Sequence, residues 1–439
     1  MGPADDGVRG SQGHTRHLVA RLHRVPGLRA LANPRFQLIV ALILLGTAAV
    51  IHLQVVLFAS GASFDLHDIV GSARSMLAGQ SPYQPMGVAP AGLSTFGPSH
   101  SNYPPTAYVL LTALAVASGP ALDVAWLVLG ELLVAGTVAM VYIGIGRPSL
   151  LEGVVVATLT LFFYPLLNDL FWGQFNQVTL FLVVAAVLAH QRARPILGGV
   201  ALGLAVGLKL TPAALLLYFA WKRNWKLVAA TLVTVAVMVG VTFLVGWGPR
   251  WAEYLSLVGP SSRGTAMYGN QTINGVLLRF WQPELNGFPI GALDPGVIVA
   301  WYAADALVLG LLLLSLRGAP AAGPLRTWTE VSLVLLALPL VQPVAWFHHH
   351  LFAVVAMVVG LRLVRARALP AAAVAALLLA YLMTTPAAVV LAVNAIPKAT
   401  PYSITGVLAS VLVVGPLIAI AALGRTRPPS APARAPSPG

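Results

Sequence analysis

Apolar segments long enough to cross a membrane recur along this chain and constrain its fold more than any other feature. Of 439 residues, 58% are hydrophobic and only 9% are charged, whereas soluble domains carry about 25% charged residues. A hydrocarbon core about 30 Å thick requires roughly 20 mostly apolar residues per helix. We therefore predict an all-α fold, a polytopic membrane helical bundle of about 11–13 transmembrane helices with an external first loop.

The apolar runs also suggest a division of the chain. Residues 1–35 are expected to form a basic, partly disordered cytoplasmic arm, 36–424 the membrane domain and 425–439 a disordered cytoplasmic tail. No cleavable signal peptide is expected, because the first apolar run is too long for one. Spans are predicted at 36–60, 122–145, 150–167, 175–190, 225–246, 293–316, 328–342, 347–364, 370–392 and 403–424.

Two segments depart from simple spans. Residues 196–221 are expected to form two short helices broken at 209–212, because Pro212 lacks an amide donor and disfavours a helical residue before it. The run of Gly and Ala residues from Gly198 to Gly207, in the first of these helices, is typical of close packing. The apolar segment 103–118 is short, so that crossing the membrane and dipping into it both stay open.

The formal charge of +13 is carried largely by short loops between apolar runs. This pattern indicates the orientation of the chain in the membrane rather than nucleic-acid binding. We therefore expect a multi-pass protein of a bacterial plasma membrane, with both termini in the cytoplasm. Arg147 fits this arrangement only if 103–118 does not cross. The cytoplasmic basic residues would be Arg192, Arg194, Lys222, Arg223, Lys226, Arg317, Arg326, Arg362, Arg365, Arg367, Arg425 and Arg427. The chain has no cysteine, which excludes disulfides, thiolate metal sites and cysteine nucleophiles.

The same topology gathers polar side chains on the opposite, external face. Such groups are costly at membrane depth and tend to mark substrate or ion pathways. A secondary transporter also fits, because broken helices are typical of that class, and a non-enzymatic lipid-binding or scaffold protein is a third alternative. The gathered residues are Asp65, Asp68, Asp169, Gln174, Asn176, Lys209, Asn270, Gln271 and His348 to His350.

A family resemblance begins at 64–83, which reads FDLHDIVGSARSMLAGQSPY. It continues in order through Tyr-Pro-Pro at 103–105, Gly-Gln-x-Asn at 173–176, Gly-Leu-Lys-Leu-Thr-Pro at 207–212, Gly-Asn-Gln at 269–271 and the histidines after Trp346. The set resembles the polyprenol-phosphate-mannose-dependent mannosyltransferases of family GT87, within the GT-C glycosyltransferases. Ile69 stands where the family has tyrosine, and Asp68 where it has an apolar residue, so both Asp65 and Asp68 are candidates for the primary carboxylate.

The resemblance implies transfer of a mannosyl residue, with inversion, from polyprenyl phosphate mannose to a lipid-linked or glycan acceptor outside the cell. Decaprenyl phosphate arabinose is the nearest alternative donor. The leaving phosphate is already charged, so one carboxylate that takes the acceptor proton meets the chemical need. Asp65 is our choice for this base, with Asp68 beside it.

The other roles follow from charge and from the resemblance. Lys209, Arg263, His349 and His350 are candidates to bind the donor phosphate. No histidine metal site is expected, since successive helical residues point about 100° apart, and no cofactor is expected, although Asp65 and Asp68 leave a divalent ion open. Membrane lipid is an expected partner and nucleic acid is not. The candidate substrate-binding residues are Tyr83, Asp169, Gln174, Asn176, Asn270 and Gln271.

Overall fold

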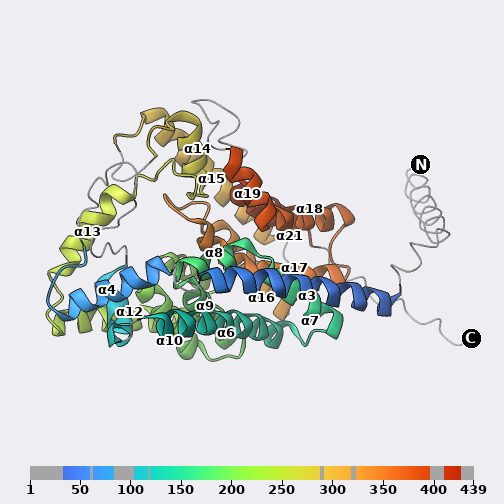
Figure 1. The fold of residues 1–439 in the computed structure, drawn as a ribbon, viewed down its shortest axis with the longest axis horizontal. Helices are drawn as coiled ribbons and strands as arrows, with labels where there is room; N and C mark the ends of the chain where they lie inside the picture. The colour runs from blue at the N-terminus through green and yellow to red at the C-terminus, as the bar shows by residue number, and fades with distance from the viewer. Residues whose placement is uncertain are drawn as a thin grey trace, which may run out of the picture.

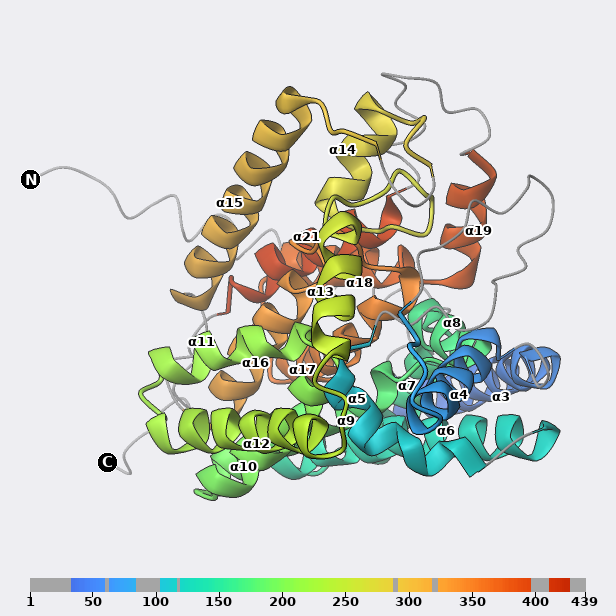
Figure 2. The ribbon, with the colours of Figure 1, turned by 90° about the vertical axis from the view of Figure 1, so that its left-hand side faces the viewer.

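The computed structural model describes residues 33–59, 63–83, 103–116, 119–286, 291–317, 323–395 and 410–426. This part of the chain is built of helices and contains no β-strand, which confirms the all-α prediction. Helices α6, α10 and α12 lie on one side of the molecule, and α14, α15, α18 and α19 lie on the other (Figures 1 and 2). The expected arm and tail fall mostly outside the described residues.

The first half of the described chain contains ten α-helices and two short 3₁₀ helices. They are α3 (Pro34–Ala59), α4 (Phe64–Leu77), α5 (Pro105–Leu111), η1 (Thr112–Val116), α6 (Pro120–Ile145), α7 (Leu150–Leu161), α8 (Tyr164–Trp172), α9 (Asn176–Gln191), α10 (Pro195–Leu208), η2 (Thr211–Ala213), α11 (Ala214–Trp221) and α12 (Trp225–Leu244).

The second half continues from the segment after α12. Its elements are α13 (Arg250–Ser261), α14 (Ile273–Trp281), α15 (Pro295–Arg317), α16 (Pro324–Ala337), η3 (Phe347–Phe352), α17 (Ala353–Arg365), α18 (Ala371–Leu382), α19 (Pro386–Ala395) and α21 (Val411–Leu423).

Several of these helices can cross a membrane. In the described part, five helices are long and apolar enough to do so alone: α3, α6, α12, α15 and the continuous η3–α17 unit. The bent pairs α7–α8 and α18–α19 raise the number to seven if each counts as one span. Shorter apolar helices of 10–17 residues, such as α9 and α10, are not counted among these spans. The protein is therefore a multi-pass membrane protein.

The predicted break between residues 209 and 212 is present. Helix α10 ends at Leu208, and Lys209 adopts an extended conformation with φ −151° and ψ 129°. Pro212 lies within η2, from which α11 follows. The break leaves Lys209 at the end of a helix, with its side chain only partly buried.

Glycines on one face of α10 allow close approach to α12. A Cβ atom added at Gly199 would lie 2.4 Å from the Cβ of Ala230, and one at Gly203 would lie 2.5 Å from the Cβ of Thr234. Gly207 continues the same face and would bring a Cβ within 2.5 Å of Met238. This spacing of four residues is the small-residue pattern of tightly packed membrane helices, as the sequence suggested.

The structure also answers the question of Arg147. The described part of this segment, residues 103–116, forms α5, of seven residues, and η1, of five, which together are too short to cross a bilayer. The Arg362 guanidinium donates to the carbonyl oxygens of Gly146 and Arg147, at 2.7 and 3.0 Å. Arg147 therefore lies at the same end of the bundle as Arg362.

The remaining basic loops meet at this end as well. Gln191, at the end of α9, donates to the Gly144 carbonyl at 3.0 Å and accepts a hydrogen bond from Trp328 in α16 at 3.1 Å. Buried Glu330, also in α16, pairs with Lys222 at 2.6 Å and with Arg326 at 2.9 Å. Basic loops far apart in sequence thus share one end, as the positive-inside pattern predicts.

Candidate active site

Asp65 lies in the first turn of α4, where this helix meets the end of α8. Helix α8 ends at Trp172, and Gly173, which caps it, has the left-handed φ of +70°. A Cβ atom at this position would lie 2.7 Å from the Cβ of Leu66. Glycine supplies both the conformation and the space, and the chain reverses so that the next residue, Gln174, reaches α4.

Gln174 links Asp65 to Tyr103. Its side-chain Nε2 donates a hydrogen bond to Oδ2 of Asp65, and its Oε1 accepts one from the Tyr103 hydroxyl at 3.1 Å. The indole of Trp126 holds the Gln174 main-chain carbonyl at 3.3 Å. Because the Gln174 amide oxygen accepts the hydrogen bond from the Tyr103 hydroxyl, the Gln174 amide nitrogen points to the Asp65 carboxylate.

The surroundings of Tyr103 and Asp65 shift both acids in the same direction. Burial raises the pKa of Tyr103 well above its usual value, so the hydroxyl stays protonated and can donate. Burial also raises the pKa of Asp65 to about 6, with a further rise from the charge of Asp68. The hydrogen bond from Gln174 and the charge of Lys209 oppose this rise. Asp65 remains partly exposed, so its carboxylate is accessible.

A second polar chain lies beside the first. Asn176 donates through Nδ2 to Oδ1 of Asp169 at 2.6 Å and accepts from Lys209 Nζ at 2.7 Å. Asp169 and Asn176 are both fully buried. The charge of Lys209 acts on Asp65 and on Asp169. The positive charge of Lys209 thus stabilises the ionised forms of two carboxylates that come from different helices.

The three histidines face different partners. They lie in η3, a 3₁₀ rather than an α-helix, where successive residues point about 120° apart. His348 Nδ1 lies 3.1 Å from Asn168 Oδ1, His349 Nδ1 accepts from the Trp346 amide at 3.0 Å, and His350 Nε2 donates to the Gln271 carbonyl at 3.0 Å. Among the described residues no group of three or more histidine or acidic side chains could hold a metal ion.

Two of these rings belong to the surroundings of Lys209, whose charge acts on both His348 and His349. In a neutral His349 ring, an accepting Nδ1 leaves the hydrogen on Nε2, which becomes a donor. His349 is partly exposed, whereas His348 and His350 are buried. His349 Nε2 is therefore a second hydrogen-bond donor close to Lys209, whose charge also acts on Asp65.

Some buried polar atoms near this cluster have no hydrogen-bond partner in the part of the chain that the structure describes. Asp169 Oδ2 and His348 Nε2 are two of them. Buried polar atoms are rarely left unpaired in folded proteins. Each of these two atoms can accept a hydrogen bond from water or from a substrate hydroxyl.

The side chains of Asn270 and Gln271 form hydrogen bonds with main-chain groups rather than with the Asp65 and Lys209 cluster. Both are fully buried. Asn270 donates to the carbonyls of Thr265 and Pro343, at 2.9 and 3.1 Å. Gln271 donates to the Tyr268 carbonyl at 2.8 Å and accepts from the Leu412 amide at 3.2 Å. The Asn270 amide thus joins the segment after α13 to the segment before η3, and the Gln271 amide joins it to the start of α21.

Tyr83 and Arg263 occupy two further positions. The Tyr83 hydroxyl donates to the Tyr103 carbonyl at 2.9 Å, and its ring packs against Tyr108 and Tyr254. Tyr83 therefore supports the residue that orients Gln174. Arg263 is exposed in the connection between α13 and α14, where its carbonyl accepts from Asn274 at 3.3 Å.

Sequence reasoning did not assign Tyr103 to the site. Its signal is the Tyr-Pro-Pro sequence, in which Pro104 is extended and Pro105 begins α5. A rigid entry of this kind fixes the direction of the preceding residue. Thr106, one residue further on, donates to the Gly207 carbonyl at 2.8 Å and ties α5 to the end of α10 near Lys209.

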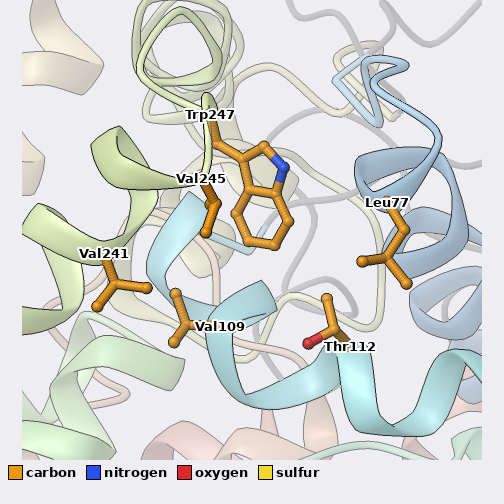
Figure 3. A pocket seen from close by; sticks show the side chains of 6 residues that line it. All are labelled: Leu77, Val109, Thr112, Val241, Val245 and Trp247. Atoms are coloured by element: carbon orange, nitrogen blue, oxygen red, sulfur yellow. The ribbon is translucent and has the colours of Figure 1, made fainter.

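An apolar cavity of about 310 Å³ is formed by some of the same helices. Figure 3 shows the Trp247 indole above Val109 and Thr112, with Leu77 and Val245 on either side. The lining comes from the end of α4, from α5 and η1, and from the end of α12 and the turn after it. Helix α4 thus carries Asp65 at its start and part of this cavity at its end.

Curated relatives of this chain include two of similar description. The polyprenol-phosphate-mannose-dependent alpha-(1-2)-phosphatidylinositol mannoside mannosyltransferase of Mycobacterium tuberculosis is 30% identical over 59% of this chain and 62% of its own length. The corresponding pentamannoside mannosyltransferase of Mycolicibacterium smegmatis is 31% identical over 42% of each chain. The chain thus matches less than two thirds of the length of either relative.

A solved structure and a family model complete the comparison. The structure of ArnT from Cupriavidus metallidurans bound to undecaprenyl phosphate is 14% identical, at a TM-score of 0.39, over 86% of this chain and 76% of that one. The model of glycosyltransferase family 87 matches residues 102–343, which is more than half of the sequence. The chain belongs to glycosyltransferase family 87.

Proposed function

We propose that this protein transfers a mannosyl residue from polyprenyl phosphate mannose to a lipid-linked or glycan acceptor at the extracytoplasmic face of a bacterial plasma membrane. Family membership and the donor named for both relatives support this reading. The position of Asp65 supports it further, because the carboxylate lies in α4, just after the apolar helix α3, whereas the described basic loops gather at another end of the bundle.

In the proposed step, Asp65 takes the proton of an acceptor hydroxyl while the hydroxyl oxygen attacks the anomeric carbon of mannose. A new carbon–oxygen bond forms as the bond to the donor phosphate breaks, and polyprenyl phosphate leaves with the electron pair. One direct displacement inverts the anomeric configuration. With a pKa of about 6, Asp65 is ionised at neutral pH and still basic enough to accept the proton.

Lys209 and His349 are the groups that we assign to the departing phosphate. The charge of Lys209 acts on both Asp65 and His349, and hydrogen-bond donors of this kind stabilise charge that develops in the transition state. The sequence also predicted His350 and Arg263 for this role. His350 already donates to the Gln271 carbonyl, and Arg263 lies in the α13–α14 connection, so we place both outside the first contacts of the phosphate.

The remaining assignments concern the sugar and the lipid. We place mannose hydroxyls at the unpaired acceptors Asp169 Oδ2 and His348 Nε2, and the isoprenoid chain of the donor in the apolar cavity beside Trp247. Gln174, Asn176 and Tyr83 then orient these groups, while Asn270 and Gln271 hold the backbone that carries η3. No step requires a metal ion or a cofactor.

The names of the relatives favour a mannoside lipid as acceptor and mannose over arabinose as the transferred sugar. The broken helix at Lys209 is compatible with a secondary transporter. If the protein took up a solute into proteoliposomes and formed no glycosylated product, the transporter hypothesis would replace the glycosyltransferase hypothesis.

The observation that carries the proposal is the partly exposed Asp65, oriented by Gln174 and placed near Lys209. The test uses full-length protein in detergent with polyprenyl phosphate mannose and a phosphatidylinositol mannoside, and mass spectrometry detects the product. We expect Asp65→Asn to lower kcat about 10²- to 10⁴-fold and the matched Asp68→Asn to lower it less than about tenfold. Wild-type turnover by Asp65→Asn would refute the base assignment.

A further inference from the structure

A second cavity lies at the end of the molecule where the basic loops meet. Its volume is about 280 Å³, and its lining residues are Trp221, Leu313, Leu316, Arg317 and Arg326. They come from the end of α11, the end of α15 and the start of α16. The proposed glycosyl transfer does not use this cavity.

The walls of the cavity change from apolar to basic along α15. This helix is long and apolar enough to cross the membrane. Leu313 is 61% exposed on it, as expected of a side chain that faces lipid, and the helix ends one turn later at Arg317. Trp221 is 55% exposed at the end of α11, and tryptophan favours the boundary between hydrocarbon and headgroups. The cavity therefore combines a hydrocarbon-facing part with a cationic part.

Cations outnumber acidic groups around the cavity. Glu330 is buried, and its carboxylate accepts hydrogen bonds from Lys222 at 2.8 Å, Arg326 at 2.9 Å and Tyr218 at 2.9 Å. Lys222 also lies 4.4 Å from the centre of the Trp221 ring. Lys222 and Arg326 thus share a single carboxylate, and Arg317 adds a third positive charge to the cavity lining, so the positive charge exceeds what Glu330 can neutralise.

We propose that this cavity binds an anionic phospholipid of the leaflet that the basic loops face. The headgroup phosphate lies at Arg317 and Arg326, whose planar guanidinium groups suit phosphate oxygens. An acyl chain lies along Leu313, Leu316 and Trp221. Basic pockets between membrane helices on the cytoplasmic side bind anionic headgroups in this way, and the charge excess selects them over zwitterionic lipids.

The test is native mass spectrometry of the purified full-length chain, titrated with phosphatidylglycerol or with phosphatidylcholine of the same acyl chains. We expect retained phosphatidylglycerol that excess inorganic phosphate does not displace. Arg317→Gln should lower this retention about fivefold, as expected for one basic side chain near an anionic headgroup. Leu313→Trp, which adds bulk to the apolar wall, should lower the retention of both lipids.

Arg192→Gln is the matched control, because Arg192 is exposed after α9 and does not line the cavity. It should retain phosphatidylglycerol as the wild type does. Melting temperatures in phosphatidylcholine should agree among the wild type, Arg317→Gln and Arg192→Gln, which shows that the variants fold. Equal retention of the two lipids by the wild type, or equal loss in Arg317→Gln and Arg192→Gln, would overturn the proposal.

Discussion

Gly173 lies against Leu66 so closely that a methyl group on the glycine would come within 2.7 Å of the Leu66 Cβ atom. This contact between the end of α8 and the start of α4 places Gln174 beside Asp65, although 109 residues separate the two in sequence. The geometry of the candidate base therefore depends on the absence of a side chain at Gly173.

Gly173→Ala should reduce transfer by displacing α4. The variant combines strain from a positive φ, about 1–2 kcal/mol, with a collision against Leu66 that costs about 1–3 kcal/mol. Gly119→Ala is the matched control, since Gly119 has a φ of +74° and no atom within 4 Å of an added Cβ. Melting temperature and kcat would be measured for both. Equal kcat in the two variants would mean that the Leu66 contact does not position the base.

Gln174 and Tyr103 should act as positioning residues. Gln174→Leu removes the hydrogen bond to Asp65, and we expect kcat to fall about 100-fold, as for a misplaced reacting group. Tyr103→Phe keeps the amide but loses one hydrogen bond to it, and we expect about a fivefold loss, or ~1 kcal/mol. In Gln174→Leu the acidic limb of the pH–rate profile should also move to higher pH, because the bond favours the ionised form of Asp65. A purely structural effect would lower kcat without moving the limb.

The sequence predicts the helices better than it predicts their partners. The apolar runs and Pro212 indicate the spans and the break after α10, because helix length and proline act locally. Tyr103 was not assigned to the site, since the hydrogen bond that gives it a role crosses 71 residues. The sequence also predicts the same substrate-binding role for Asn176 and Asn270. In the structure Asn176 accepts a hydrogen bond from Lys209, whereas Asn270 donates to backbone carbonyls.

The pH dependence of transfer should report Asp65. A general base works as the carboxylate, and burial raises the pKa of Asp65 to about 6, so kcat/KM should rise with pH through about 6 and then level off. The donor is a phosphodiester and does not titrate in this range. Initial rates between about pH 4.5 and 8 would define the limb.

Asp68→Asn gives a second test of the same assignment. The negative charge of Asp68 contributes to the raised pKa of Asp65. Its removal should lower that pKa and move the acidic limb of kcat/KM to lower pH, with the plateau largely preserved. If the limb disappears in Asp68→Asn, Asp68 is the titrating base and the two roles are exchanged.

The glycines of α10 should differ in how well they tolerate a methyl group, because their neighbours differ. At Gly199 the added Cβ meets the Leu227 carbonyl oxygen at 2.5 Å, which only a backbone movement can relieve, whereas at Gly207 it meets the flexible end of Met238. Gly199→Ala should therefore lose about 1–3 kcal/mol of stability, and Gly207→Ala should lose less. Gly240→Ala on α12, with no atom within 4 Å, should be neutral or gain up to about 1 kcal/mol from helix propensity. Melting temperatures in one detergent would rank the three, and a Gly199→Ala variant as stable as Gly240→Ala would show that α10 and α12 do not pack through these glycines.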